Sequence, residues 1–232
     1  MLSKVFEKTY VKILKIIIDE REIIPSHQFG FRNNHGTIEQ VHRLVNQINK
    51  DLNANRYCSA AFLDISQAFD KVWHAGLQVK LKRFLPHPHF QLLRSYLTGR
   101  HFMVKHGCDY TELHPIYSGV PQGSVLGPIL YLIYTADLPT TRTTTVATYA
   151  DDTAILASHT DPTSASRNLQ TNLNKVQQWL QTWRIKANET KSIHVTFTLR
   201  RETCPPVMIN NCQLPQVKDA KYLGMHLDRR LT

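Results

Sequence analysis

The chain has 232 residues, of which 42% are hydrophobic, and this is enough for one or two domains with a buried core. Its formal net charge of +10 favours a polyanionic partner, nucleic acid before a membrane surface, although solubility alone also explains such an excess. No apolar run reaches membrane-spanning length, the N-terminal residues do not follow a signal-peptide pattern, and the four cysteines form no CxxC pair. We therefore expect an intracellular protein, nuclear or cytoplasmic, with free thiols and no membrane partner.

The N-terminal quarter of the chain predicts two amphipathic helices joined by a loop. Apolar residues at helical spacing predict a helix over residues 4–24, ended by a proline. Thr37 and Gln40 resemble a capping box that begins a second helix. The connecting loop, residues 26–36, contains Arg32, for which we weigh a phosphate contact against an ordinary surface position.

A buried strand and further helices come next. The apolar run over residues 57–65 predicts a strand with Asp64 at its end. Residues 66–73 then turn into a helix, where Phe69 is expected to project back over the strand end and Asp70 to lie on the helix surface. Two more helical patterns cover residues 77–84 and 90–97, with a loop expected at residues 87–89.

The middle of the chain contains a hairpin, a loop of small residues and an apolar helix. Weak alternation over residues 101–117, with a turn signal at Gly107, predicts a β-hairpin. Residues 118–124 form a loop that opens a helix over residues 125–136 and would let a ligand approach the backbone closely. Taken alone, this loop is only a helix start.

Residues 146–157 predict two short strands joined by a turn that carries Asp151 and Asp152. Adjacent carboxylates at a tight turn repel each other unless a cation lies beside them. The alternative is that these residues are there because aspartate favours turns. The remaining patterns are a helix over residues 169–183, a turn at 188–190, a strand at 191–197, a loop or hairpin at 204–216 and a short strand at 221–228.

The order of these elements predicts an α+β fold, an antiparallel sheet with helices on one face. In that arrangement Asp64 lies at a strand end beside the hairpin that carries Asp151 and Asp152. Three carboxylates at one sheet edge fit a two-metal site, in which Mg²⁺ ions about 3.5–4 Å apart activate an attacking oxygen and stabilise a leaving one. Because Mg²⁺ fills its shell with water and substrate phosphates, such a site suits a triphosphate substrate.

Six motifs that follow one another along the chain carry a family resemblance. They are QFGFR at residues 28–32, FLDISQAFD at 62–70, SGVPQGS at 118–124, YADD at 149–152, NETK at 188–191 and YLG at 222–224. Together they resemble the reverse transcriptase domain of non-LTR retrotransposons, most like the jockey-type elements of animals. The resemblance implies an RNA-directed DNA polymerase, a nucleotidyltransferase that adds dNTPs to a DNA primer 3′-OH on an RNA template.

The resemblance also implies a polymerase palm with partial helical fingers and a role for individual residues. The expected domains are partial fingers at residues 1–55, the palm with the catalytic carboxylates at 56–200, and the end of the palm with the primer grip at 201–232, without a thumb. The implied catalytic residues are Asp64, Asp151 and Asp152, which would bind two Mg²⁺ ions (with Mn²⁺ as a possible substitute), and Lys191 near the leaving pyrophosphate. The implied dNTP-binding positions are the backbone amides of Ile65 and Ser66, the Phe69 ring under the sugar, and Gln122. The implied primer or template positions are Arg32, Tyr222, Leu223 and Gly224.

Members of this family have more chain on both sides, namely further finger strands, a thumb and an upstream endonuclease, so the resemblance implies truncation at both ends. One alternative is therefore a non-catalytic remnant that folds and at most binds nucleic acid. A second alternative is an RNA-templated RNA polymerase, which shares the palm. Phe69 disfavours it, because a bulky ring beneath the sugar would clash with the 2′-OH of an rNTP.

Overall fold

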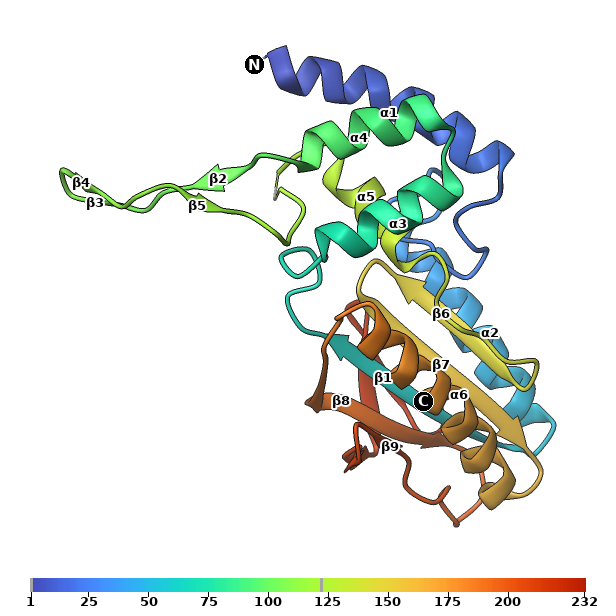
Figure 1. Cartoon of the computed structure of the whole chain (residues 1–232). Helices are drawn as coiled ribbons and strands as arrows, with labels where there is room; N and C mark the ends of the chain where they lie inside the picture. Colours follow the sequence, from blue (N-terminus) through green and yellow to red (C-terminus); the bar gives the residue numbers. More distant parts are fainter. Residues whose placement is uncertain (1, 122) are drawn as a thin grey trace. The chain divides into compact units, whose positions relative to one another are not determined.

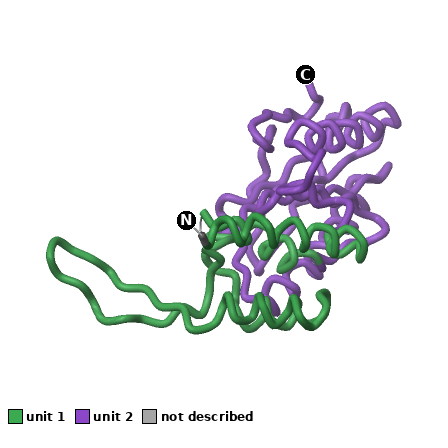
Figure 2. Tube along the Cα trace, turned by 90° about the horizontal axis from the view of Figure 1, so that it is seen from above, with its two compact units in different colours: residues 1–24, 67–136 green, residues 25–66, 137–232 purple. Residues whose placement is uncertain are grey.

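The structure, a computed structural model, describes residues 2–121 and 123–232 and divides into two compact units. Unit 1 comprises residues 1–24 and 67–136, and unit 2 comprises residues 25–66 and 137–232, drawn in green and purple in Figure 2. Each unit is thus built from two separate stretches of chain. The predicted boundaries after residues 55 and 200 concern functional subdomains, and they remain a prediction.

Unit 1 contains four helices of the described chain and a long hairpin. The helices are α1 (Leu2–Glu20), α3 (His74–Phe84), α4 (His87–Leu97) and α5 (Gly127–Thr135). The hairpin consists of β2 (His101–Phe102), β3 (Lys105–His106), β4 (Asp109–Tyr110) and β5 (His114–Pro115). Strand β2 pairs with β5 and β3 with β4, both antiparallel, which confirms the predicted hairpin around Gly107.

Two predictions in unit 1 need correction. The predicted loop at residues 87–89 is wrong, because α4 begins at His87 with Pro88 in its first turn, where proline is tolerated. Residues 66–71 form turns and Trp73 forms a β-bridge with Ser118 instead of a helix, so Asp70 lies in a turn before α3. The carbonyl groups of Phe69 and Val72 accept hydrogen bonds from the 118–120 loop, which holds this segment out of a helical geometry.

Unit 2 is built on a five-stranded sheet with strand order β11-β8-β1-β7-β6. Its strands are β1 (Tyr57–Ile65), β6 (Thr144–Tyr149), β7 (Asp152–His159), β8 (Ala187–Phe197) and β11 (Gln216–Val217). The other elements are helices α2 (Thr37–Asn53) and α6 (Pro162–Thr182), and the short pairs β9 (Met208–Ile209) with β10 (Cys212–Gln213) and β12 (Asp219–Tyr222) with β13 (Met225–Asp228). Strand β1 is antiparallel to both β7 and β8, whereas β11 is parallel to β8.

Helices cover both faces of this sheet (Figure 1). Cys58, Ala60 and Phe62 of β1 pack on the face covered by α2 and the β12–β13 hairpin, whereas Ala61 and Leu63 pack against α6. Seven consecutive residues of β1 are buried, as expected for a strand between two layers. The α+β class is confirmed, and the structure corrects one detail, because the helices do not share one face.

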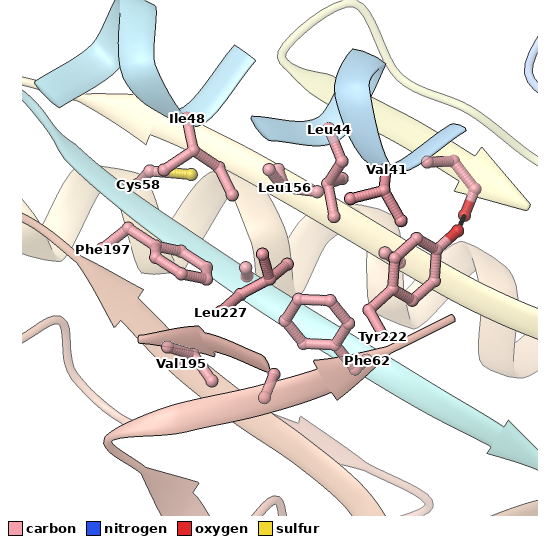
Figure 3. Close-up of a cluster of buried hydrophobic side chains, with 14 of the residues drawn as sticks. Val41, Leu44, Ile48, Cys58, Phe62, Leu156, Val195, Phe197, Tyr222 and Leu227 are labelled. Carbon is pink, nitrogen blue, oxygen red and sulfur yellow. Dashed lines mark hydrogen bonds between the residues drawn. The ribbon is translucent and has the colours of Figure 1, made fainter. Parts of the chain in front are cut away.

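The core beneath α2 joins distant parts of unit 2, as Figure 3 shows. Leu44 and Ile48 of α2 point toward the sheet, and both are fully buried. The ring of Tyr222 lies 5.7 Å from the ring of Phe62, and the Tyr222 hydroxyl donates a hydrogen bond of 3.3 Å to the carbonyl of Ala147. These contacts fix the β12–β13 hairpin against β1 and β6.

Helix α2 starts as predicted, but its capping is different. Its N-cap residue is Gly36, and no side chain caps it. The Gln40 side chain donates instead to the carbonyl groups of His27 and Thr148, 3.0 and 2.9 Å away. Gln40 therefore ties α2 to β6. Within the described residues, no helix is both long and apolar enough to cross a membrane.

Candidate active site

Three aspartates meet at one end of the central strands of unit 2. Leu63 of β1 pairs with Thr153 of β7, so Asp64, the next-to-last residue of β1, lies beside the start of β7 at Asp152. Tyr149 pairs with Asp152 across β6 and β7, which leaves Ala150 and Asp151 as a two-residue turn. The strand register thus brings Asp64, Asp151 and Asp152 together, as the sequence predicted.

The three carboxylates lie in an environment that disfavours their negative charges. The pKa of Asp152 is raised above its ordinary value, first because nearby atoms remove part of its hydration and then because Asp151 and Asp64 are negatively charged. Asp152 as a residue is exposed, so the desolvation comes from atoms crowding its carboxyl group while one side stays open. Among the described residues, no Lys, Arg or His forms an ion pair with any of the three.

This excess of negative charge fits a divalent cation. Carboxylate oxygens are the protein ligands that hard cations such as Mg²⁺ take, often with only one or two of them per ion. In the described part of the chain, however, no group of three or more Asp, Glu, His or Cys side chains is placed so that it could hold a metal ion by itself. An ion here would therefore complete its shell with water or substrate oxygens.

Lys191 lies in an irregular part of β8 next to Asp64. Asp64 pairs with Asn188 and Phe62 with Ile193, so β8 bulges between these pairs. The Asn188 side chain accepts hydrogen bonds from the backbone amides of Thr190 and Lys191, at 3.2 and 3.4 Å, and forms the predicted turn inside the strand. Lys191 is exposed on this bulge.

Ser192 is a residue of the site that the sequence analysis did not identify. It is fully buried and accepts a hydrogen bond of 3.1 Å from the backbone amide of Asp64. Its hydroxyl donates to the carbonyl of Asn188 at 2.7 Å. Ser192 thus joins the bulge that carries Lys191 to the backbone of Asp64. Only its position beside Lys191 could have suggested this role.

The predicted dNTP-binding positions fall in both units. In unit 2, the Ser66 amide donates to the carbonyl of Lys186 at 2.9 Å, so its hydrogen bond is made within the protein. Ile65 pairs with Ala187. In unit 1, Phe69 is half-buried, and its ring stacks on Tyr131 with centroids 4.7 Å apart.

The remaining predicted positions are Gln122, Arg32, Tyr222, Leu223 and Gly224. Gln122 lies outside the described residues. Arg32 donates to the carbonyl groups of Pro25 and Gln28, at 3.3 and 3.2 Å, and so holds its own loop. Tyr222 is buried in the core, whereas Leu223 and Gly224 form the turn between β12 and β13, both with positive φ.

Tyr222 is nevertheless close enough to the acids to respond to their charge. Burial raises the pKa of its hydroxyl, and the negative charge of Asp152 raises it further, whereas Arg43 lowers it. The turn of Leu223 and Gly224 therefore belongs to a hairpin that is anchored beside the acidic turn.

A sheet that carries three aspartates on a strand end and an adjoining hairpin is the arrangement of a polymerase palm. Among solved structures, the chain resembles apo telomerase from Candida tropicalis truncated from its C-terminal domain, with a TM-score of 0.67, 12% sequence identity, and coverage of 95% of this chain and 43% of that one. Residues 1–227 match the family described as "Reverse transcriptase (RNA-dependent DNA polymerase)". The chain belongs to the reverse transcriptase family.

Curated relatives place the chain more closely within that family. It is 44% identical over 236 residues to the "Probable RNA-directed DNA polymerase from transposon X-element" of Drosophila melanogaster. It is 41% identical over 239 residues to the "RNA-directed DNA polymerase from mobile element jockey" of the same species. Both alignments cover 100% of this chain and 26% of the relative, so the chain spans about a quarter of their length. The predicted resemblance to jockey-type elements is confirmed.

Proposed function

We propose that this chain forms the polymerase centre of an RNA-directed DNA polymerase that adds dNTPs to the 3′-OH of a DNA primer on an RNA template. The observation that carries the proposal is the meeting of Asp64, Asp151 and Asp152 at one strand end, where desolvation and the charges of the other two acids raise the pKa of Asp152. Reverse transcriptases use divalent metal ions, and these three residues are acids with no protein counter-ion among the described residues. We propose that they hold two Mg²⁺ ions, with Mn²⁺ as a substitute.

The chemistry follows from the groups that the chain supplies. Bound Mg²⁺ would lower the pKa of the primer 3′-OH and neutralise charge on the phosphates. The carboxylates of Asp64 and Asp151 would orient the reacting oxygens, and Asp152 would sustain the local negative charge. Lys191, exposed beside Asp64, would donate a proton to the leaving pyrophosphate.

The other predicted positions would select and hold the substrates. Phe69, whose ring is held by stacking on Tyr131, would exclude the 2′-OH of an rNTP. Gln122 and the amides of Ile65 and Ser66 would line the dNTP site, and the Ser66 amide would first have to leave the Lys186 carbonyl. The positions proposed at the primer and template are Arg32, Tyr222, Leu223 and Gly224. The net charge of +10 would hold both strands through their phosphates.

Primer extension tests the proposal. The purified chain is incubated with poly(rA)/oligo(dT), Mg²⁺ and dTTP, beside Asp151→Asn and a matched control, Asp109→Asn, whose carboxylate lies on the exposed hairpin of unit 1. We expect extension by the wild type and the control and none by Asp151→Asn. A folded wild-type chain that binds primer-template without extending it would instead support the non-catalytic remnant. Efficient incorporation of rNTPs would favour the RNA polymerase.

A further inference from the structure

The turn that carries Asp151 has an unusual backbone. Ala150, the residue before Asp151, has a φ of 57°. This value lies in the left-handed region, which residues other than glycine rarely adopt. Two-residue hairpin turns with a positive φ at this position normally use glycine there. Ala150 is nevertheless buried and its backbone is well enclosed. Some other part of the protein must therefore hold this conformation.

The side chain of Gln28 makes the contacts that hold it. Its Oε1 accepts a hydrogen bond of 3.0 Å from the amide of Ala150, and its Nε2 donates one of 3.3 Å to the carbonyl of the same residue. A primary amide carries a donor and an acceptor side by side, so it can pair with both backbone groups of one residue. Gln28 is only 4% exposed, so water does not compete with these bonds.

The backbone around Gln28 is built to approach the turn. A Cβ atom on Gly30 would lie 2.3 Å from the amide nitrogen of Ala150, so only glycine allows this distance. The amide of Gly30 also donates to Oε1 of Gln28 at 2.9 Å. One side-chain oxygen therefore ties the loop and the turn together.

Neighbouring bonds fix Gln28 itself. Phe29 donates its amide to the carbonyl of Thr148, and the amide of Thr148 donates to the carbonyl of His27, so the loop pairs with β6 in parallel. Arg32 donates to the carbonyl of Gln28 at 3.2 Å. The chain of contacts thus runs from Arg32 through Gln28 to Ala150 and the acidic turn.

We propose that Gln28 is a positioning residue that holds Asp151 and Asp152 in the geometry needed for metal binding, with Gly30 providing the close approach. This inference rests on the proposed function of the three aspartates. It gives residues 28–32 a role in shaping the acidic turn, in addition to any contact that Arg32 makes with a template. A displacement of about 1 Å in a catalytic group is enough to cost about 100-fold in rate.

The variants for the test are Gln28→Met, which keeps the length of the side chain and removes both hydrogen-bonding groups, and Gln28→Glu, which keeps the acceptor and loses the donor. The matched control is Gln213→Met, on an exposed position of β10. For each protein we would measure kcat and KM for dTTP in primer extension, the affinity for Mn²⁺ alone by calorimetry, and amide hydrogen exchange at Ala150. Assays run well below the melting temperature, which separates positioning from a loss of folded protein.

We expect Gln28→Met to lower kcat by about 10- to 100-fold with KM for dTTP changed less than about 3-fold, because the substrate site itself is intact. Mn²⁺ affinity should fall about 10-fold, and exchange at Ala150 should accelerate. Gln28→Glu sets a carboxylate oxygen against the Ala150 carbonyl oxygen, so it should also lower kcat and accelerate exchange at Ala150, and Gln213→Met should match the wild type. If Gln28→Met does not fold, the same comparison between Gln28→Glu and the wild type decides.

Wild-type values of kcat, Mn²⁺ affinity and Ala150 exchange in the folded Gln28 variants would overturn the inference and leave the proposed function standing. An inactive wild type would contradict the proposed function instead. In that case Mn²⁺ affinity and Ala150 exchange still decide on Gln28, because neither measurement depends on polymerisation.

Discussion

The Ser59 hydroxyl oxygen of β1 lies 2.7 Å from Nε2 of His194, which pairs with Ala61 two residues further along β1. Both residues are fully buried. The Gln216 side-chain amide lies 3.1 Å from Nδ1 of the same ring and donates to it, so Nδ1 is the acceptor and Nε2 carries the proton. A second proton on the ring would have no acceptor, which agrees with the lowering of the pKa of His194 to about 4 by burial.

This pair predicts a loss of stability in mild acid. The unfolded chain binds a proton near the ordinary histidine pKa of about 6.5, whereas folded His194 stays neutral down to about pH 4. The free energy of unfolding should therefore fall by about 3 kcal/mol as the pH drops from about 6.5 to 4. Urea unfolding at several pH values measures this. His194→Gln should reduce the pH dependence of the free energy of unfolding. Part of the dependence that remains should come from His27, whose pKa is also lowered to about 4, by burial and by Arg43.

Removal of one carboxylate should stabilise the metal-free protein. Desolvation and then the charges of Asp151 and Asp64 raise the pKa of Asp152, so these charges repel the ionised Asp152 carboxylate. Asp151→Asn is expected to raise the free energy of unfolding by about 0.5–1 kcal/mol in chelator. Millimolar Mg²⁺ or Mn²⁺ should raise the melting temperature of the wild type and should have little effect on the variant. Equal metal responses in both proteins would contradict the assignment of Asp151 as a ligand.

Two glycines of unit 1 should respond differently to alanine. Gly119 and Gly107 both have positive φ, 89° and 61°, so alanine at either position is strained by about 1–2 kcal/mol. At Gly119 a Cβ atom would also lie 2.9 Å from the carbonyl oxygen of Asp70, whereas nothing lies within 4 Å at Gly107. Gly119→Ala is therefore expected to cost at least about 1 kcal/mol more than Gly107→Ala. Chemical denaturation of the two variants measures the difference. Equal losses of unfolding free energy would show that the 118–120 loop moves to relieve the clash with Asp70.

Glu7 of α1 caps the start of α5 from a distance in sequence. Its Oε2 accepts hydrogen bonds from the amides of Val125 and Leu126, at 2.7 and 3.3 Å, and its side chain is buried. A carboxylate at a helix start satisfies amides that have no partner in the helix and faces the positive end of its dipole. Glu7→Ala should cost about 1–3 kcal/mol in urea unfolding. Glu7→Gln should cost less, and the exposed control Glu20→Ala should stay within about 0.5 kcal/mol of the wild type.

Phe69 predicts the sugar preference of the proposed reaction. Its ring is held by stacking on Tyr131, so its position should be well defined. Phe69→Val opens the space that a 2′-OH would occupy and should raise rNTP incorporation relative to dNTP about 10-fold or more. Tyr131→Phe keeps the stacked ring and serves as the control. An unchanged ratio in Phe69→Val would remove this residue from the sugar site.

The sequence predicted those elements whose signal is local. The limits of β1 follow from an apolar run whose next-to-last residue is Asp64, and the acidic hairpin follows from two short apolar stretches around Asp151 and Asp152. The start of α4 was misjudged because proline in a first helical turn has the same sequence signal as proline in a loop. Gln40 matched a capping pattern, but a bond to Thr148 of another element competes for its side chain.

Long-range partners leave no local pattern, and these account for what was missed at the site. Gln28 and Ala150 are 122 positions apart, and the sequence around neither residue predicts their contact. In the sequence, Ser192 is an ordinary polar residue of an alternating strand, and only the structure shows its hydrogen bond to the backbone amide of Asp64. The three aspartates could be grouped from the sequence because strand ends and hairpin turns bring such residues to one edge of a sheet.

The two units interrupt each other along the chain, so neither unit is synthesised as one continuous segment. Helix α1 belongs to a unit whose other helices begin only at His74, and β1 pairs with strands that begin at Asp152 and Ala187. A ribosome therefore releases the first residues of both units long before their partners exist. Contacts of such high sequence separation slow folding, and no single cut in the chain leaves both units whole. Synthesis rate and chaperone supply should therefore decide the yield of this protein more than its final stability does.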